Sequence, residues 1–504
     1  MVESYFKRPP RALPPELEEE RQRIQALARA QGLDFFETVF EMCDYDEINM
    51  LASYGGFPTR YPHWRWGMEF LQMQKGYEYG LQKIYEMVIN TNPAYAYLLD
   101  NNLHVDQKLV MAHVFGHVDF FKNNLWFAPT NRKMLDTMAD HAVRVRRIVD
   151  KVGASAVEEW LDVCLSCDNL IDPYLNQIRR TRAADAPEDD PGVHKLPAAR
   201  RYMDRYINPP EVMAAEEARL AAAAARPLPF PESPVRDVLG FVLEHGRMAG
   251  WQREVLEIIR DEAYYFVPQM QTKVMNEGWA SFWHTKLMTE HLLTDSEVID
   301  YCDHHSGTVT MRPGQLNPYK VGIEVWRDVQ YRWDRGQFGL DWMECDDATA
   351  RRDWDTGAKL GRAKLFEVRR THNDVTFIDE YLTPELCRRI GLFTWEYDKR
   401  SGEYVLDSRD FDTIKKKLLF MLSNHGTPRV SVTDGNHANR GELELTHDHE
   451  GVDVQLQWAE TVLGNLARLW GRPVHLRSRV ENKPARMSHD GSSFTYEGSK
   501  PSGK

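Results

Sequence analysis

Two histidines of this chain, spaced one helical turn apart, have the residue type and the spacing that could bind a metal ion. His113 and His117 lie in residues 109–126, where apolar residues recur at helical spacing. Imidazoles at positions i and i+4 project from one stripe of a helix and can bind one metal ion together. In a hydrolytic zinc helix the residue after the first histidine is a glutamate that acts as general base, and here it is Val114. The pattern therefore predicts a metal-binding helix without its usual catalytic group.

A metal held by two histidines needs at least one further ligand, and a carboxylate from a later helix is the expected source. Glu277 is the best candidate, because Gly278 beside it would let another backbone or a ligand approach closely. His284 lies on the same predicted helix face, roughly 10 Å further along the axis, so one ion would not bind both side chains. We expect His284 to contact one of the metal-binding side chains, to contact the substrate, or to belong to a second site.

Other acidic residues could support this site. Asp261 and Glu262 could supply a ligand, hold a ligand in place or replace the missing base, and Asp119 lies on the histidine helix itself. We take Glu262 and His284 as the candidate catalytic residues. The alternative is that His113 and His117 only make hydrogen bonds inside a helical core, because this spacing also arises by chance.

The remaining motifs are weaker. Cys164 and Cys167 form a Cys-x-x-Cys pair with no second pair to complete a tetrahedral site, so we expect reduced, packed thiols. His304 and His305 are adjacent and should point apart. The sequence contains neither a glycine-rich phosphate loop nor a Gly-x-Ser-x-Gly nucleophile motif.

Composition limits the class of protein. The chain has 504 residues, a formal net charge of −13 and 42% hydrophobic residues, enough for two or three domains without disulfides. The acidic balance and the lack of a long basic run argue against nucleic acid or an anionic membrane as the main partner. Because neither a signal sequence nor a run of about 18 apolar residues occurs, we expect a cytoplasmic protein without membrane insertion.

Most elements that would position these residues are predicted to be helical. Apolar periodicity predicts helices over 35–52, 132–174 and 238–291, with a break at Pro268, and a strand pair at 85–92 and 93–100 just before the histidine helix. Pro318 suits the first turn of a further helix. Beyond about residue 373 the elements shorten, with strands predicted at 429–433, 442–447 and 474–479 and a helix at 454–470.

The predicted fold class is mainly α with a small β-sheet, plus a small C-terminal α+β domain. We expect an N-terminal extension over 1–13, a mainly helical domain over 14–370 and the C-terminal domain over 375–480. The polar tail over 484–504 is expected to be disordered.

Three motifs resemble those of the SpoVR family of stage V sporulation protein R and its bacterial relatives: residues 113–124, 276–284 and 316–320. The resemblance extends over about 14–480. It implies a role in spore cortex formation, or in stationary-phase and stress physiology in other bacteria. It also implies two partners, a PrkA-type serine protein kinase and a von Willebrand factor A-type protein. No reaction follows from membership.

A more distant resemblance bears on mechanism. His113-Val-Phe-Gly-His117 is similar to the His-Glu-Phe-Gly-His of gluzincin metallocarboxypeptidases, and residues 277–280 are similar to the helix that supplies their glutamate ligand. The resemblance implies a zincin-like α+β core with His113, His117 and Glu277 as ligands of Zn²⁺, and an edge strand that holds an extended peptide. The sequence departs from this pattern at Val114.

Three functions remain open. The first is a metallohydrolase acting on a peptide or a peptide-like amide, with Glu262 or His284 handling the proton. The second is a regulatory or scaffold protein that acts with the kinase system and keeps the core as a relic. The third is an oxygen-dependent iron site, because two histidines and a carboxylate also form a facial triad.

Overall fold

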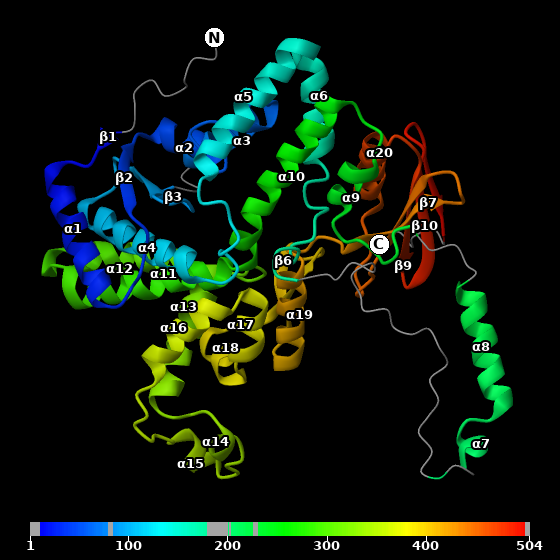
Figure 1. Cartoon of the computed structure of the whole chain (residues 1–504). Coiled ribbons are helices and arrows are strands. Elements are labelled where there is room, and N and C mark those ends of the chain that lie inside the picture. The colour runs from blue at the N-terminus through cyan, green and yellow to red at the C-terminus, as the bar shows by residue number, and fades with distance from the viewer. Residues whose placement is uncertain (1–10, 79–83, 179–199, 201–202, 225–229, 499–504) are drawn as a thin grey trace. The chain divides into compact units, whose positions relative to one another are not determined.

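The computed structural model describes residues 11–78, 84–178, 200, 203–224 and 230–498 (Figure 1). The chain divides into two compact units, each made of two stretches of sequence. The first contains the described residues up to Asp162 together with Asp261–Thr427, and the second contains Val163–Arg260 together with the described residues from Pro428 onward. The predicted N-terminal extension lies mostly outside the described residues, although Arg11–Ala12 form a short strand, β1.

The predicted domain boundary near residue 375 is wrong, because the division falls after Thr427. The prediction rested on a change to shorter elements, but those elements still bury their apolar side chains in the core of the first unit. Phe377, Leu386, Ile414 and Leu418 are examples. Residues 163–260, predicted to belong to the helical domain, belong instead to the second unit.

The described helices of the first unit are α1 (Pro15–Ala30), α2 (Tyr45–Ser53), α3 (Trp64–Glu78), α4 (His104–Asn123), α5 (Met134–Val152), α11 (Lys273–Leu287), η3 (Met288–Leu292), η4 (Asp295–Glu297), α12 (Val298–Thr308), α13 (Pro318–Asp334), α14 (Leu340–Met343), α15 (Ala348–Arg352), α16 (Gly361–Thr371), α17 (Asp374–Tyr381), α18 (Pro384–Ile390) and α19 (Phe411–Ser423). Two helices begin in one unit and end in the other, α6 (Ala154–Leu165) and α10 (Gly250–Gln271). The predicted break at Pro268 is wrong, since α10 continues through it to Gln271.

A small sheet lies in the first unit, in the order β1-β2-β4-β3. Its main strands are β2 (Thr38–Cys43), β3 (Glu86–Ile89) and β4 (Ala94–Leu99), and β5 (Thr394–Asp398) pairs separately with β6 (Glu403–Ser408). β4 runs parallel to β2 and antiparallel to β3, which forms the edge. The strand pair predicted before the histidine helix is therefore confirmed as β3 and β4.

The two faces of this sheet contact different cores. Met42, Leu98 and Val88 face the core that includes α4, whereas Met87 and Tyr97 face the core that includes α2. The predicted helix over 35–52 is wrong for Thr38–Cys43, which form β2. The helix α2 begins only at Tyr45. Asp44 is its N-cap and forms a capping box with Glu47 in the first turn. Pairing of β2 with β4 therefore outweighs the helical spacing of its apolar residues.

The helix α4 passes through the core of the first unit, with every residue from Val105 to Phe121 buried. It crosses α11 where Gly116 meets Ala280, and α11 crosses α13 where Gly278 meets Gly322. A Cβ atom on Gly278 would lie 2.4 Å from the backbone of Gly322. The expectation that Gly278 admits another backbone is therefore confirmed, and the crossing fixes Glu277 beside it.

The second unit contains a five-stranded sheet in the order β11-β10-β9-β8-β7. Its described elements are α7 (Asp204–Ile207), α8 (Pro210–Ala224), α9 (Val238–His245), β7 (Val430–His437), β8 (Glu442–His447), α20 (Leu456–Trp470), β9 (Val474–Val480), β10 (Lys483–His489) and β11 (Phe494–Glu497). The predicted strands at 429–433, 442–447 and 474–479 and the helix at 454–470 are confirmed.

The prediction of a disordered tail from 484 is wrong over the described part of that tail. The strand β10 pairs with β9 along its whole length, and β11 pairs with β10. Ala485 and Met487 are buried at alternate positions of β10, a short apolar pattern hidden among polar residues. No helix within the described residues is long and apolar enough to cross a membrane.

Candidate metal centre

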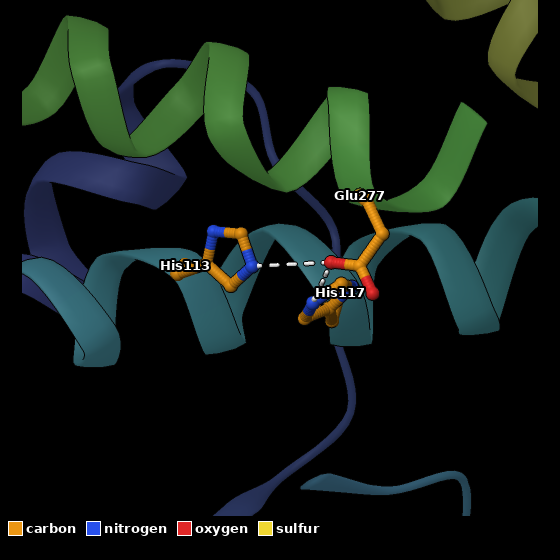
Figure 2. A group of neighbouring side chains, drawn as sticks. All are labelled: His113, His117 and Glu277. Atoms are coloured by element: carbon orange, nitrogen blue, oxygen red, sulfur yellow. Dashed lines mark ion pairs between the residues drawn. The ribbon is translucent and has the colours of Figure 1, made fainter. Parts of the chain in front are cut away.

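Three side chains from two crossing helices converge in the first unit (Figure 2). His113 and His117 lie one turn apart on α4, and Glu277 faces them from α11. The Oε2 atom of Glu277 lies 3.5 Å from Nε2 of His113 and 3.4 Å from Nε2 of His117. Within the described parts of the chain, this is the one group of three such side chains whose ligand atoms all lie within 4.8 Å of one another.

These distances fit a shared ion better than hydrogen bonds. An N–H···O hydrogen bond is usually about 2.9–3.0 Å long, whereas both separations here are 3.4–3.5 Å. Ligand atoms about 2.1 Å from a tetrahedral zinc ion lie about 3.4 Å apart. The Oε2 atom of Glu277 is also buried without a hydrogen-bond partner. A buried carboxylate oxygen in this position is the kind of group that a cation would satisfy.

Each histidine uses its other ring nitrogen for an outer partner. The Nδ1 atom of His117 lies 2.9 Å from Oδ1 of Asn276, an acceptor, so Nδ1 carries the proton and Nε2 is left free. The Nδ1 atom of His113 lies 2.8 Å from Nδ1 of His284. Outer hydrogen bonds of this kind hold a metal-binding imidazole in the correct tautomer.

His284 continues this chain of rings toward α12. Its Nε2 atom lies 3.3 Å from Nδ1 of His305, which is only partly buried. If Nε2 of His113 is reserved for an ion, its Nδ1–H donates to His284, and His284 in turn donates to His305. His284 is therefore brought to the site as a partner of His113, one of the roles expected from its spacing.

Burial and charge set the protonation of the three candidate ligands. Burial, followed by the charge of His117, lowers the pKa of His113 to about 4, which leaves its ring neutral. Burial opposes protonation of His117, but the nearby Glu277 carboxylate outweighs it and raises the pKa of His117. Burial also works against ionisation of Glu277, yet the two histidines hold its pKa well below the usual range. A neutral imidazole and an ionised carboxylate are the forms that bind metals, so His113 and Glu277 are already held in these forms. His117 would have to release its second proton when an ion binds.

Two residues near the triad were not among the predicted site residues. Tyr319, at the start of α13, stacks on His113 with ring centroids 6.1 Å apart. Burial raises the pKa of its phenol, and the charges of Glu277 and Glu86 raise it further. Glu86 comes from the edge strand β3, and burial raises the pKa of its carboxyl to about 7. Neither residue has a local spacing signal that links it to α4.

The other predicted residues lie elsewhere. Glu262 is buried in a second cluster, where it accepts from Arg60 at 2.8 Å and Tyr61 at 3.2 Å and lies 3.2 Å from His141. Its neighbour Asp261 lies 3.5 Å from His141. These contacts join α10 to α5 and to Arg60 and Tyr61, which precede α3.

Asp119 is also structural. It accepts from the indole of Trp279 at 2.8 Å, from Arg369 at 2.6 Å and from the backbone N–H of Asp34 at 2.7 Å. These bonds join α4, α11 and α16 instead of contributing a ligand. Cys164 and Cys167 are buried and unbridged in the second unit, as expected for packed thiols.

The chain is similar over most of its length to known protein families. The sequence profile described as "SpoVR like protein" matches residues 12–427, and the one described as "SpoVR-like C-terminal domain" matches residues 428–481. The "Uncharacterized protein YcgB" of Escherichia coli (strain K12) is 28% identical over 501 residues, which cover 91% of each chain. The comparison with solved structures finds no match. The boundary between the two profiles coincides with the division after Thr427.

Proposed function

The chain belongs to the SpoVR family, and from that premise we propose that it holds one zinc-type ion with His113, His117 and Glu277. The observation that carries the proposal is the position of one orphaned carboxylate oxygen, 3.4–3.5 Å from the Nε2 atoms of two buried histidines. Three protein ligands leave a tetrahedral ion one open position, as in catalytic zinc sites. We expect a role in sporulation or stationary-phase stress physiology, in the cytoplasm.

Two of the three separations between the ligand atoms are compatible with the zinc ion that we propose. With bonds of about 2.1 Å, the edges of a tetrahedron are about 3.4 Å long, and those of an octahedron about 3.0 Å. The observed separations of 3.4 and 3.5 Å match the tetrahedral value. An iron facial triad remains the alternative that the metal analysis described below distinguishes.

The reaction that this site supports best is hydrolysis of a peptide or a peptide-like amide. A zinc ion lowers the pKa of a water that it binds to about 7 and polarises a carbonyl group. β3 is the edge strand of the sheet that precedes α4, so its outer side is the place where an extended peptide could add a further strand. This arrangement of sheet, histidine helix and glutamate helix supports a zincin-like core.

A regulatory function is the second candidate, and Val114 favours it. Val114 is fully buried in the apolar core, so the position that carries the base in related zinc helices carries no proton-accepting group here. In this case the protein would act with a PrkA-type serine kinase and a von Willebrand factor A-type protein. This function would be supported if the full-length chain captures the kinase and a Glu277→Ala variant, which lacks one proposed metal ligand, captures it equally well.

The test of the metal site is elemental analysis of the purified full-length chain. We expect about one zinc per chain in the wild type, and its loss in His113→Ala and in Glu277→Ala. His291→Ala is a matched control, because His291 is exposed and lies outside the triad. A folded wild-type protein without stoichiometric metal would contradict the proposal. Stoichiometric iron would contradict the zinc site and favour the iron facial triad.

A further inference from the structure

The strand β3 carries a carboxyl group on the face of the sheet that lies toward the histidine helix. Side chains alternate along a strand, so Glu86 shares a face with Val88. Val88 packs against the core that contains α4 and α11, and the cross-strand neighbour of Glu86, Leu98, is buried in the same core. Glu86 therefore faces the helices that carry the triad.

The electrostatic partners of Glu86 agree with this placement. The charges of His117, Glu277 and His304 act on its carboxyl, and the charge of Glu86 acts in turn on Tyr319. Tyr319 stacks on His113. Glu86 on the sheet and Tyr319 on α13 thus both lie near the triad.

We propose that Glu86 is the general base of this site and takes the role that Val114 cannot fill. This inference rests on the proposed metal function. A glutamate on an edge strand lies beside the path of a peptide that adds to that strand. Burial raises the pKa of the Glu86 carboxyl to about 7, close to the value that suits a proton acceptor at neutral pH.

The reaction balances with water as the only co-reactant. The Glu86 carboxylate accepts one proton from a water molecule lying between it and the triad, while the water oxygen bonds to the carbonyl carbon of the amide. The C–N bond then breaks, the protonated Glu86 returns the proton to the leaving nitrogen, and the products are a carboxylic acid and an amine. Glu86 ends in its initial state.

The chain contains a matched control on the opposite face of the same sheet. Glu41 on β2 is also a half-buried carboxyl whose pKa is raised by burial. Its cross-strand partner is Tyr97, which belongs to the core on the α2 side. Replacing Glu41 therefore removes a partly buried carboxyl that does not face the triad.

The test uses zinc-loaded full-length protein and acetohydroxamate, a small zinc-binding acid whose binding needs an acceptor for its proton. We expect Glu86→Gln to keep its zinc and to bind acetohydroxamate at least about 10-fold more weakly than wild type. Glu86→Asp, which keeps a carboxylate, should recover part of the affinity, and Glu41→Gln should bind like wild type.

Three results would overturn the inference. Wild-type affinity in zinc-containing Glu86→Gln would remove its role as base and leave the metal site intact. Loss of zinc from a folded Glu86→Gln protein would make Glu86 a ligand instead. A wild type without any metal would refute the proposed function, and the base with it.

Discussion

Single side chains in the first unit form two layers around one carboxylate oxygen. The Nε2 atoms of His113 and His117 lie nearest to the Glu277 oxygen and form the inner layer. The outer layer consists of Asn276, which contacts Nδ1 of His117, and His284, which contacts Nδ1 of His113. An outer partner restricts both the tautomer and the rotation of the ring that it contacts. These outer contacts would hold both rings in the orientation that the proposed ion needs.

His284→Ala should weaken metal binding without unfolding the chain. Removing the 2.8 Å contact to His113 frees that ring to rotate and to take the wrong tautomer, for which a loss of about 10–100-fold in affinity is typical. Competition with a chromogenic zinc chelator measures this loss. His372→Ala, which removes a histidine that contacts Glu380 instead, should bind zinc like the wild type.

At the scale of elements, three helices approach so closely that small residues are required. Gly116 on α4 meets Ala280 on α11, and Gly278 on α11 meets Gly322 on α13. Close approach at these points places α4 and α11 near enough for Glu277 to reach both histidines. Gly278 thus contributes to the site by allowing the close helix crossing beside Glu277.

Gly278→Ala should destabilise the protein and reduce its zinc content together. The added Cβ would lie 2.4 Å from the backbone of Gly322, so α11 and α13 would have to separate, at a cost of about 1–3 kcal/mol. Thermal unfolding and elemental analysis measure the two effects. Gly67→Ala on α3 is the control, because a Cβ there meets no atom within 4 Å and should be neutral or slightly stabilising. Unchanged stability in Gly278→Ala would refute the close crossing.

The helix α11 is capped by a residue from a distant segment. The carboxylate of Asp374 accepts the backbone N–H groups of Val274 and Met275, each at 2.8 Å. Burial outweighs these bonds and raises the pKa of Asp374 from 3.8 to about 7. The folded protein therefore binds a proton here more tightly than the unfolded chain does.

A pH-dependent contribution to stability follows from this shift. The contribution of Asp374 is present below pH 3.8 and is lost as the pH rises through about 7, because the native state binds more protons in that window. Asp374→Asn cannot ionise, so its free energy of unfolding should fall less than that of the wild type between about pH 5 and about pH 8. Urea unfolding at both pH values measures the difference. A parallel pH response in the two proteins would contradict the raised pKa.

At the scale of the whole molecule, each compact unit is assembled from two separate stretches of sequence. In the second unit Val235 forms a β-bridge with Val432, and α9 packs with β7 and α20. Val235 and α9 therefore depend on residues that follow Thr427 for their packing. A fragment beginning near 375 would divide the core of the first unit and leave the second without its earlier stretch.

A chain that ends at Thr427 should keep the triad but lose the order of the segment around α9. Without β7, the bridge at Val235 and the packing of α9 are missing, so the segment 230–250 should be cleaved much faster in limited proteolysis. Mass spectrometry of the fragments locates the cleavage, and zinc analysis follows the triad. Equal protection in the truncated and full-length chains would show that α9 does not need the C-terminal sheet.

The spacing of apolar residues alone was enough to predict the helices and strands whose local signal agrees with their packing. The periodicity around His113 and His117 indicated α4, and the apolar runs indicated β3, β4 and most of the C-terminal sheet. It failed at β2, whose apolar residues have helical spacing but pair with β4, and at β10, whose two buried residues are masked by polar neighbours. In each case a contact with a distant strand outweighed the local signal.

The sequence by itself determined that two imidazoles share one helix face, because that depends only on the turn of an α-helix. It also indicated Glu277 and the close approach at Gly278, through residue type and resemblance. Only the tertiary structure decided which other groups surround the triad. Glu86, Tyr319 and His305 come from a strand and two helices far apart in the chain, and Glu262 was drawn into an ion pair with Arg60. Spacing carries no information about such contacts, because they arise only when the helices and the sheet pack together.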